Sequence, residues 1–381
     1  MNLFKRIVIF ALALCCFIGS LSFTAFGEFS LSGTSAQSAA LLCADNGQFL
    51  YKKNADIKLP MASTTKIMTA LVAIENSSPD DTVAVDRRAV GVEGSSIYLT
   101  EGEVLKMEEL LFGLLLASAN DAAEAIAFEI GKSIEGFAAL MNNKAKELGL
   151  SNTHFDNPHG LDSENHYTTA SDLAILTSEA LKNDTFAKIV STYKFTISTK
   201  NGARVLINHN KLLRTYEGSI GVKTGFTKRS GRCLVSAAKR NGLTLVAVTI
   251  NAPDDWNDHR TLLDSGFSAY SMVNALDERE YKVSLPVIGG TDQTVLCLSQ
   301  DKISAVLSSD ISPQDLSFTL EMPNFLYAPI EKGERVGKLT VKLKGKTIGQ
   351  TDITAEYSVS AVEYKTSIWQ KLIDFLSGLF S

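Results

Sequence analysis

Two hairpin signatures separated by helical sequence constrain the fold of this 381-residue chain more than any other feature. Residues 39–51 and residues 233–250 each hold two apolar runs joined through an Asn-Gly pair, Asn46-Gly47 and Asn241-Gly242. Asn-Gly is the strongest short-range hairpin signal, because both central residues of the tightest turns adopt positive φ. Strands at both ends of a segment with helices between them favour an α+β fold, here an antiparallel sheet flanked by helices.

The sequence between the hairpins carries apolar residues at the spacing of amphipathic helices. The first helix is expected shortly after Pro60, a residue common at helix starts. The further predicted helices span residues 107–116, 122–130, 133–148 and 169–181. Asn120 or Asp121 is expected to cap the helix over residues 122–130, and Gly149 to end the helix over residues 133–148.

A change of composition near residues 277–280 marks a second domain. Beyond it the apolar residues alternate, Gly, Asp and Lys form turns, and helical signals are few. Regular short strands of this kind predict a small β-sandwich domain over residues 280–362, after a first domain over residues 28–276. The clearest alternating stretches are residues 283–287, 295–298 and 336–341.

The amino-terminal residues 1–27 have the pattern of a cleavable secretory signal peptide. Lys5 and Arg6 precede a short apolar run, and small residues follow up to Gly27. An uncleaved anchor is the alternative, although the apolar run is short for a membrane span. We therefore expect an exported protein that works outside the cytoplasm.

Composition fits an ordinary globular protein rather than a disulfide scaffold or a nucleic-acid-binding protein. The net charge is −5, so nothing indicates nucleic-acid binding. Cys15 and Cys16 fall within the signal peptide, which leaves Cys43, Cys233 and Cys297. Three cysteines are few, and an odd number cannot all pair within one chain, so we expect buried free thiols and not a disulfide framework.

The carboxy-terminal residues 364–381 show a single apolar stripe at helical spacing. The segment is too short and too charged to span a bilayer, so we expect an amphipathic helix on the membrane surface. A helix docked on the β-domain is the alternative. The stripe consists of Ile368, Trp369, Leu372, Ile373, Leu376, Leu379 and Phe380.

The first chemical signal is Ser63 and Lys66, three residues apart at the start of a predicted helix. That spacing puts both side chains on one helix face, with about 5–6 Å between Cβ atoms. A serine hydroxyl needs a neighbour to take its proton, and the helix dipole and partial burial both lower the pKa of a lysine placed there. Ser-x-x-Lys alone is unspecific, since it recurs at residues 191–194, 236–239 and 299–302 without a helix start.

The second signal, Ser118-Ala-Asn120, lies in the break between two apolar helices. The Ser118 hydroxyl could relay a proton to a leaving group. The Asn120 amide could orient a substrate peptide bond or the lysine. The alternative is that Asn120 only caps the following helix, and the two roles are compatible.

The third signal, Lys223-Thr224-Gly225, follows a strand-like run and occurs once in the chain. A strand bordering a cleft can pair with an extended peptide, and Gly225 leaves room for close backbone approach. The Lys223 ammonium and the Thr224 hydroxyl would offer positive charge and a donor to a substrate carboxylate. The alternative is a strand end with an exposed lysine.

The fixed order of the three motifs is more specific than any one of them, and it indicates serine acyl transfer with lysine as the base. Together with residues 60–69, 115–122, 157–161 and 221–227, the motifs make the chain resemble the low-molecular-mass penicillin-binding proteins, which are serine-type D-alanyl-D-alanine carboxypeptidases. The resemblance covers essentially the whole chain. It implies the β-lactamase/DD-peptidase fold and catalysis without a cofactor or metal.

The resemblance also implies a role for the residues of the first two motifs. Ser63 would be the acylated nucleophile and Lys66 its base. Ser118 and Asn120 would relay protons and position the substrate, a peptidoglycan stem peptide that ends in D-Ala-D-Ala.

For the third motif, the resemblance implies substrate binding. Lys223 and Thr224 would hold the terminal carboxylate of the stem peptide or of a β-lactam antibiotic, and Gly225 would leave room for the substrate backbone. The backbone N–H groups of Ser63 and Phe226 would form the oxyanion hole. In some relatives an arginine after the last sheet strand assists, and whether Arg260 does so here stays open.

The same residues bear on several alternative functions. A class A β-lactamase would need a carboxylate base, but Glu164 and Glu179 do not lie in the Glu-x-x-Leu-Asn pattern of those enzymes. A DD-endopeptidase or a catalytically silent penicillin-binding sensor would share the motifs. A Ser-His-Asp hydrolase lacks its Gly-x-Ser-x-Gly elbow, and the histidines of residues 154–166 lack metal-ligand spacing.

Overall fold

The computed structural model describes residues 33–199, 202–309 and 311–363. The predicted signal peptide (1–27) and the predicted tail helix (364–381) lie outside these ranges. Within the ranges, helices are too short or too polar to cross a lipid bilayer.

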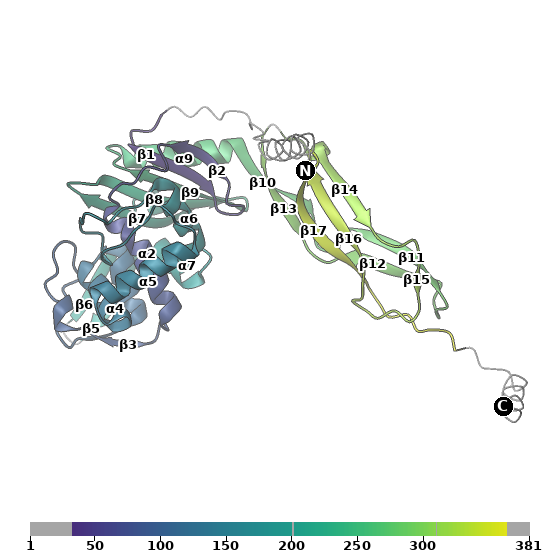
Figure 1. Cartoon of the computed structure of the whole chain (residues 1–381), viewed down its shortest axis with the longest axis horizontal. Helices are drawn as coiled ribbons and strands as arrows, with labels where there is room; N and C mark the ends of the chain where they lie inside the picture. Colours follow the sequence, from purple (N-terminus) through teal and green to yellow (C-terminus); the bar gives the residue numbers. More distant parts are fainter. Residues whose placement is uncertain (1–32, 200–201, 310, 364–381) are drawn as a thin grey trace, which may run out of the picture. The chain divides into compact units, whose positions relative to one another are not determined.

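A five-stranded antiparallel sheet forms the centre of the first domain, in the order β2-β1-β9-β8-β7 (Figure 1). The amino-terminal strand β1 therefore pairs both with its neighbour β2 and with the distant β9, and β7 lies at one edge. The strands are β1 (Ser38–Cys43), β2 (Phe49–Lys53), β7 (Ser219–Thr227), β8 (Gly231–Arg240) and β9 (Leu243–Ile250).

Helices cover both faces of this sheet, so all six residues of β1 are buried. Ala40 and Leu42 belong to the main core under one helical layer. Leu41 points the other way and packs with Leu245 against Gly266 of α9 (Asp255–Ala269). This alternation is the period of two that a strand imposes, and it explains the almost continuous apolar sequence of β1.

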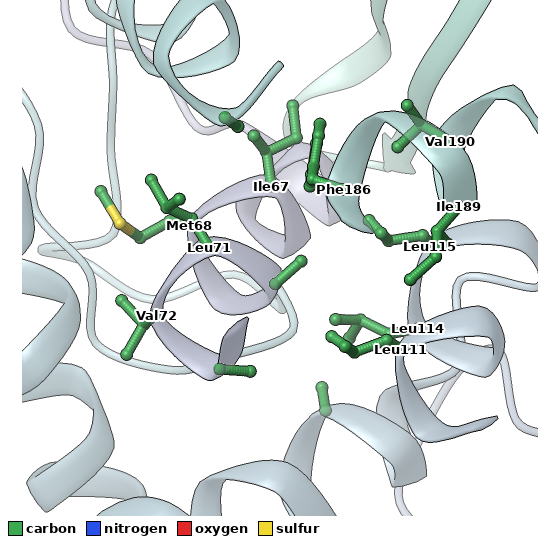
Figure 2. Packing of buried hydrophobic residues seen from close by; sticks show 14 of the residues in the cluster. Ile67, Met68, Leu71, Val72, Leu111, Leu114, Leu115, Phe186, Ile189 and Val190 are labelled. Carbon is green, nitrogen blue, oxygen red and sulfur yellow. The ribbon is translucent and has the colours of Figure 1, made fainter. Parts of the chain in front are cut away.

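The main core surrounds α2 (Lys66–Asn76), the helix that starts next to Ser63. Figure 2 shows apolar side chains of α2 in one cluster with those of α3 and α7. The helices that contact α2 are α3 (Met107–Leu116), α4 (Asn120–Gly131), α5 (Ile134–Glu147), α6 (Ala170–Ala180) and α7 (Asp184–Ser191). The predicted base, Lys66, and the turn that carries the predicted nucleophile are thus anchored on the main apolar core of the domain.

Short elements complete the first domain. Two small antiparallel pairs, β3 with β4 and β5 with β6, lie outside the central sheet. The bounds are η1 (Ala62–Thr65), η2 (Arg87–Ala89), α8 (Leu212–Thr215), β3 (Thr82–Ala84), β4 (Val104–Lys106), β5 (Lys194–Thr199) and β6 (Gly202–Ile207).

Helix boundaries follow the sequence signals closely. The helix α3 spans the predicted residues 107–116, and the side chains of Ser133 and Thr169 cap α5 and α6. The predicted cap of α4 is wrong: the N-cap is Ala119, and Asn120 is already the first helical residue. The helices α7, α8 and α9 were not predicted.

The two Asn-Gly pairs form different turns. Asn241 and Gly242 both have positive φ, 48° and 85°, and make the predicted two-residue turn between β8 and β9. In the first hairpin only Gly47 has positive φ, at 73°. There Asn46 Oδ1 accepts a hydrogen bond from Gln48 N–H at 2.9 Å, and the register shifts next to the turn. A longer, bulged loop replaces the predicted tight turn because the Asn46 side chain bonds its own loop.

The remaining strands form a separate all-β domain. A six-stranded sheet has the order β14-β16-β17-β12-β11-β15, and β10 pairs with β13. Both sheets contribute to one apolar core, which includes Leu276, Ile303, Leu339 and Ile353. The bounds are β10 (Tyr270–Leu276), β11 (Lys282–Ile288), β12 (Thr294–Ser299), β13 (Ile303–Ser308), η3 (Pro313–Asp315), β14 (Leu316–Glu321), β15 (Leu326–Tyr327), β16 (Arg335–Leu343) and β17 (Lys346–Ala355).

This domain starts earlier than the predicted residue 280. Strand β10, which the sequence assigned to the first domain, pairs with β13 from Tyr270 to Leu276. The change of composition at residues 277–280 is therefore a turn within the domain and not the linker before it. The three alternating stretches lie within β11, β12 and β16, as predicted.

Candidate active site

Ser63 lies in η1, the short turn that leads into α2. The preceding residue, Ala62, has φ of 47°, which is uncommon for a residue other than glycine. Thr65 Oγ1 donates a hydrogen bond to Ala62 O at 2.8 Å and closes this turn. The result is a tight backbone corner that places Ser63 on the wall of a cleft.

Lys66 is completely buried, with 0% of its surface exposed. Its Nζ lies 2.6 Å from Asn120 Oδ1, 2.7 Å from His159 O and 3.1 Å from Ser63 Oγ. The amide oxygen and the carbonyl can only accept, so they take two N–H groups of the amine. The Ser63 hydroxyl can itself donate, so a neutral Lys66 directs its lone pair at that hydroxyl.

The electrostatic surroundings favour the neutral form of Lys66. Burial lowers the pKa of its ammonium well below the usual value, because the charged form loses its hydration. The nearby positive charge of Lys223 lowers the pKa further, while the carboxylate of Asp121 opposes the shift. A lysine with a lowered pKa next to a serine hydroxyl has the properties of a general base.

The Ser118-Ala-Asn120 motif lies on a strained corner before α4. Ser118 has φ of 60° and contributes to the cleft wall. Asn120 Oδ1 accepts from Lys66, its Nδ2 donates to Glu93 O at 2.6 Å, and its backbone N–H donates to Ser95 O at 2.7 Å. The Asn120 side chain is therefore engaged with the lysine, which explains why it does not cap the helix.

Asp121 fastens the adjacent loop to the same corner. This buried carboxylate accepts from Ser96 Oγ at 2.6 Å, from Leu99 N–H at 3.0 Å and from Ile97 N–H at 3.2 Å. Buried carboxylates are stable where several donors satisfy their oxygens. The loop that contains residues 96–99 is thereby held in place beside the cleft.

Strand β7 carries the third motif along the edge of the sheet, next to η1. A Cβ at Gly225 would lie 3.1 Å from Ser63 N, so only glycine lets the two backbones come this close without displacement. Lys223 is 1% exposed, and its Nζ donates to Thr224 O at 2.9 Å. Burial lowers the pKa of Lys223 to about 7.

A cleft of about 340 Å³ opens between η1, the corner at Ser118 and β7. Of the sequence-predicted residues, Ser63, Ser118, Thr224, Gly225 and Phe226 line it. Lys66, Asn120 and Lys223 are buried behind this surface. The rest of the lining, which the sequence did not predict, is Ser95, His209, Arg232, Cys233, Asp255 and Trp256.

Arg232, and not Arg260, is the arginine of the cleft. Arg260 donates both to Thr215 O at 2.9 Å and to Thr215 Oγ1 at 2.8 Å, and it does not contribute to the cleft lining. Arg232 lies on β8 opposite Phe226, and its Nη2 donates to Asp255 Oδ1 at 2.8 Å. The ion pair was invisible in the sequence because its partners come from a strand and a helix.

The histidines that follow α5 make hydrogen bonds within the protein. His154 Nδ1 lies 2.9 Å from Asn165 O, and His159 Nε2 lies 3.3 Å from Glu124 Oε1. In the described ranges, acidic, His and Cys side chains do not gather in threes around a point that could hold a metal ion. The described cysteines, Cys43, Cys233 and Cys297, are buried and free, as predicted.

Comparisons with known proteins agree over both domains. A family model for D-alanyl-D-alanine carboxypeptidases matches residues 28–254, and a model for the C-terminal domain of penicillin-binding protein 5 matches residues 270–361. The chain is 34% identical over 349 residues to the D-alanyl-D-alanine carboxypeptidase DacF of Bacillus subtilis, covering 89% of this chain and 90% of the relative. It is 31% identical over 363 residues to DacA of Escherichia coli K12, covering 91% and 88% of the two chains.

Solved structures resemble most of the chain. Penicillin-binding protein 5 of Haemophilus influenzae superposes with a TM-score of 0.66 at 26% identity, covering 87% of this chain and 99% of that one. The D-alanyl-D-alanine carboxypeptidase DacD of Francisella tularensis gives a TM-score of 0.65 at 25% identity, covering 91% and 98%. The predicted architecture of a DD-peptidase domain followed by an all-β domain is thus confirmed.

Proposed function

The chain belongs to the D-alanyl-D-alanine carboxypeptidase family, and we propose that it releases the terminal D-alanine of peptidoglycan stem peptides through an acyl-enzyme on Ser63. One observation carries the proposal. The amine of buried Lys66 lies 3.1 Å from Ser63 Oγ while its other two partners can only accept hydrogen bonds. The nucleophile and a base poised to activate it are therefore in contact before any substrate binds.

Acylation starts when the Lys66 amine takes the proton of Ser63 Oγ, and the oxygen attacks the carbonyl carbon of the penultimate D-alanine. The carbonyl oxygen becomes an oxyanion, which the backbone N–H groups of Ser63 and Phe226 stabilise. When the C–N bond breaks, the leaving nitrogen receives the proton from Lys66. Ser118 lines the same cleft and is suited to relay it.

Deacylation reverses these proton movements with water in place of the amine. Water attacks the ester carbon, Lys66 accepts a proton from the water, and the tetrahedral intermediate expels Ser63 Oγ, which takes that proton back. The same residues serve both steps because each residue that donates in one step accepts in the other. The second product is the stem peptide shortened by one residue.

The free carboxylate of the terminal D-alanine is expected next to Thr224. Thr224 faces the cleft, and Lys223 adds its charge from beneath the surface. Arg232 adds a guanidinium, which has further N–H donors beyond the one that binds Asp255. Charge-assisted hydrogen bonds of this kind are stronger than neutral ones. A β-lactam antibiotic also carries an amide and a carboxylate, so the proposal includes a stable ester of penicillin on Ser63.

Mass spectrometry of the intact protein after incubation with benzylpenicillin tests the proposal. We expect one adduct with the mass of the drug, located by peptide mapping to the segment that contains Ser63, and D-alanine release from a synthetic pentapeptide. Ser63→Ala should abolish both, whereas Ser191→Ala, a matched change in one of the unspecific Ser-x-x-Lys copies, should leave both unchanged. Acylation that persists in Ser63→Ala would disprove the assignment. Fast penicillin turnover without D-alanine release would instead favour a β-lactamase.

We propose on sequence grounds that the reaction takes place outside the cytoplasm. The pattern of residues 1–27 supports export, and the apolar stripe of residues 364–381 supports association with the membrane surface. The proposed substrate is itself an external polymer, so the location and the chemistry are consistent.

A further inference from the structure

A buried chain of hydrogen bonds leads from His166 to the peptide group that precedes Ser63. His166 is 3% exposed, and its Nε2 lies 2.8 Å from Thr65 Oγ1. Thr65 Oγ1 in turn donates to Ala62 O at 2.8 Å. None of these three residues lines the described cleft, so any role in the reaction must be indirect and not through contact with the substrate.

The surroundings of His166 fix the direction of this chain. The backbone N–H of Asp156 donates to His166 Nδ1 at 3.0 Å, so Nδ1 carries no proton. The neutral ring must then hold its proton on Nε2 and donate it to Thr65 Oγ1. Burial lowers the pKa of His166 to about 4, which keeps the ring neutral. The Thr65 hydroxyl accepts this bond and uses its own proton for Ala62 O.

The carbonyl at the end of the chain belongs to a backbone under constraint. Ala62 has φ of 47°, a sparsely populated conformation for alanine that persists only where its surroundings hold it. Gly160, with φ of 91°, lies against the same carbonyl, and a Cβ there would lie 1.9 Å from Ala62 O. The Ala62 carbonyl is therefore enclosed between the Thr65 hydroxyl and the backbone of Gly160.

Holding this carbonyl also holds the neighbouring N–H. The peptide group is planar and trans, so Ala62 O and the N–H of Ser63 point in opposite directions. A carbonyl fixed toward Thr65 leaves the Ser63 N–H fixed toward the opposite side. Under the proposed function this N–H is one of the two donors to the oxyanion.

We propose that His166 and Thr65 are positioning residues that aim the Ser63 N–H at the oxyanion. The inference rests on the proposed function and deepens it, because it explains how a donor of the oxyanion hole keeps its direction. The oxyanion exists only during the reaction, so a loss of aim should affect the transition state and not the binding of the substrate.

Two variants that remove one hydrogen bond each test the inference. Thr65→Val keeps the shape of the side chain and removes the hydroxyl, and His166→Phe removes the Nε2 donor. Loss of a whole oxyanion donor typically lowers kcat by about 10²–10³-fold, so we expect a loss of about 10–100-fold for misdirection with KM nearly unchanged. The affinity for a peptide boronic acid ending in the boron analogue of D-alanine, which forms a tetrahedral adduct on serine, should fall by a similar factor.

Matched variants separate this effect from simple destabilisation. Thr65→Ser and His166→Gln keep a donor at the critical atom and should recover most of kcat and of the boronic acid affinity. Thr177→Val removes an equally buried hydroxyl, one that donates to Leu173 O at 2.7 Å in α6, and should leave both quantities unchanged.

The outcomes distinguish the inference from the function on which it rests. Wild-type kcat and boronic acid affinity in Thr65→Val, with or without a lower Tm, would overturn the inference while Ser63 remains the nucleophile. A parallel rise in KM and fall in kcat, unrelieved by Thr65→Ser, would overturn it as well, since it would indicate general distortion. If His166→Phe does not fold, the comparison of Thr65→Val with Thr65→Ser decides the question alone. If the boronic acid did not bind Ser63 of the wild-type enzyme, the proposed function itself would fail.

Discussion

Two lysines share the site, and the proposed reaction requires opposite charge states of their amines. Under the proposed function, Lys66 would have to be neutral to accept a proton, whereas Lys223 would have to be charged to attract a carboxylate. Burial lowers the pKa of both amines, and the charge of Lys223 lowers that of Lys66 further. A bound substrate carboxylate would favour the charged form of Lys223 and so keep Lys66 neutral. Under the proposed function, substrate binding and activation of the base would thus be electrostatically coupled.

Replacement of Lys66 by arginine tests whether a neutral amine is required. Arginine keeps the charge but cannot lose its proton in a protein, so acylation by penicillin should slow by about 10²–10⁴-fold. Rates of labelling with a fluorescent penicillin measure the effect. The buried space fits an ammonium and not the larger guanidinium of arginine. Lys66→Met therefore provides a second variant, which lacks a base and has a volume similar to that of lysine. Thermal melts report whether each variant folds. Near-normal labelling in both folded variants would remove Lys66 as the base.

Replacement of Lys223 by methionine should raise the stability of the protein and lower its activity. The unfolded chain ionises this amine with a pKa near 10.5 and the folded protein with a pKa of about 7, so between these values the unfolded chain binds more protons. The wild-type protein therefore gains stability from this group as the pH rises from 7 to 10.5. At pH 7 the variant should melt several degrees higher, since 1 kcal/mol corresponds to about 2–4 °C in a domain of this size.

Two measurements decide this prediction for Lys223→Met. The difference in Tm between variant and wild type should shrink as the pH rises toward 10.5, and KM for the pentapeptide should rise about tenfold or more, because a charge-assisted contact is worth about 1.5–3 kcal/mol. Lys239→Met, an exposed change on β8, serves as the control and should alter neither quantity. A difference in Tm that is independent of pH would contradict the assignment of the shifted pKa to this lysine.

At this same scale, the motif residues could be predicted and their partners could not. Short motifs specify Ser63 and Lys66 because the spacing itself produces the contact. The pair Arg232 and Asp255 arises from the packing of α9 on β8, and no spacing rule brings a strand residue and a helix residue together. The carbonyl of His159 could not be predicted as a partner of Lys66 either, since no side-chain type marks a backbone acceptor in the sequence.

Among the elements, the contact between β7 and η1 sets the geometry of the cleft. Gly225→Ala adds a Cβ that would lie 3.1 Å from Ser63 N and from Ala62 Cβ, and 3.2 Å from Thr64 N, so strand and turn must separate by a few tenths of an ångström. Misplacement on the scale of 1 Å costs about 10²-fold in rate, so we expect acylation to slow by about 10–100-fold.

The stability of Gly225→Ala should change much less than its activity, because the added methyl displaces a surface cleft and not the main core. Thermal melts and penicillin labelling on the same sample compare the two. Wild-type labelling with alanine at position 225 would show that the approach of β7 to η1 is not critical.

Elements were predicted where their signals are local. The side chains of Ser133 and Thr169 begin α5 and α6 as their positions suggest. The helix α9 was missed because its buried face is partly polar: His259 is fully buried between Ser236 and Thr249, and Gly266 packs on the sheet. Apolar periodicity does not detect this helix, because Leu262 and Leu263 are its only large apolar buried side chains and its other buried residues are aspartate, histidine and glycine.

For the molecule as a whole, the two domains follow from two different periodicities in one chain. Alternation with a period of two continues from β11 to β17, whereas helical spacing dominates between β2 and β7. The boundary was harder to predict than the domains, because β10 follows α9 without the glycine or proline that would mark a linker.

The sequence of the carboxy terminus leads to a prediction about the location of the whole molecule. Deletion of residues 364–381 removes the apolar stripe but no part of the described domains, so D-alanine release by the truncated enzyme should equal that of the full chain. After expression in cells that process the signal peptide, the truncated enzyme should move from the membrane pellet to the soluble fraction. Replacement of Leu372 and Leu376 by serine should release the full-length chain in the same way, because surface binding of a helix scales with its buried apolar area. Retention of both variants in the pellet after signal cleavage would rule out the stripe as the anchor. Loss of activity in the truncated enzyme alone would indicate instead that residues 364–381 stabilise the domains, which is the docked-helix alternative.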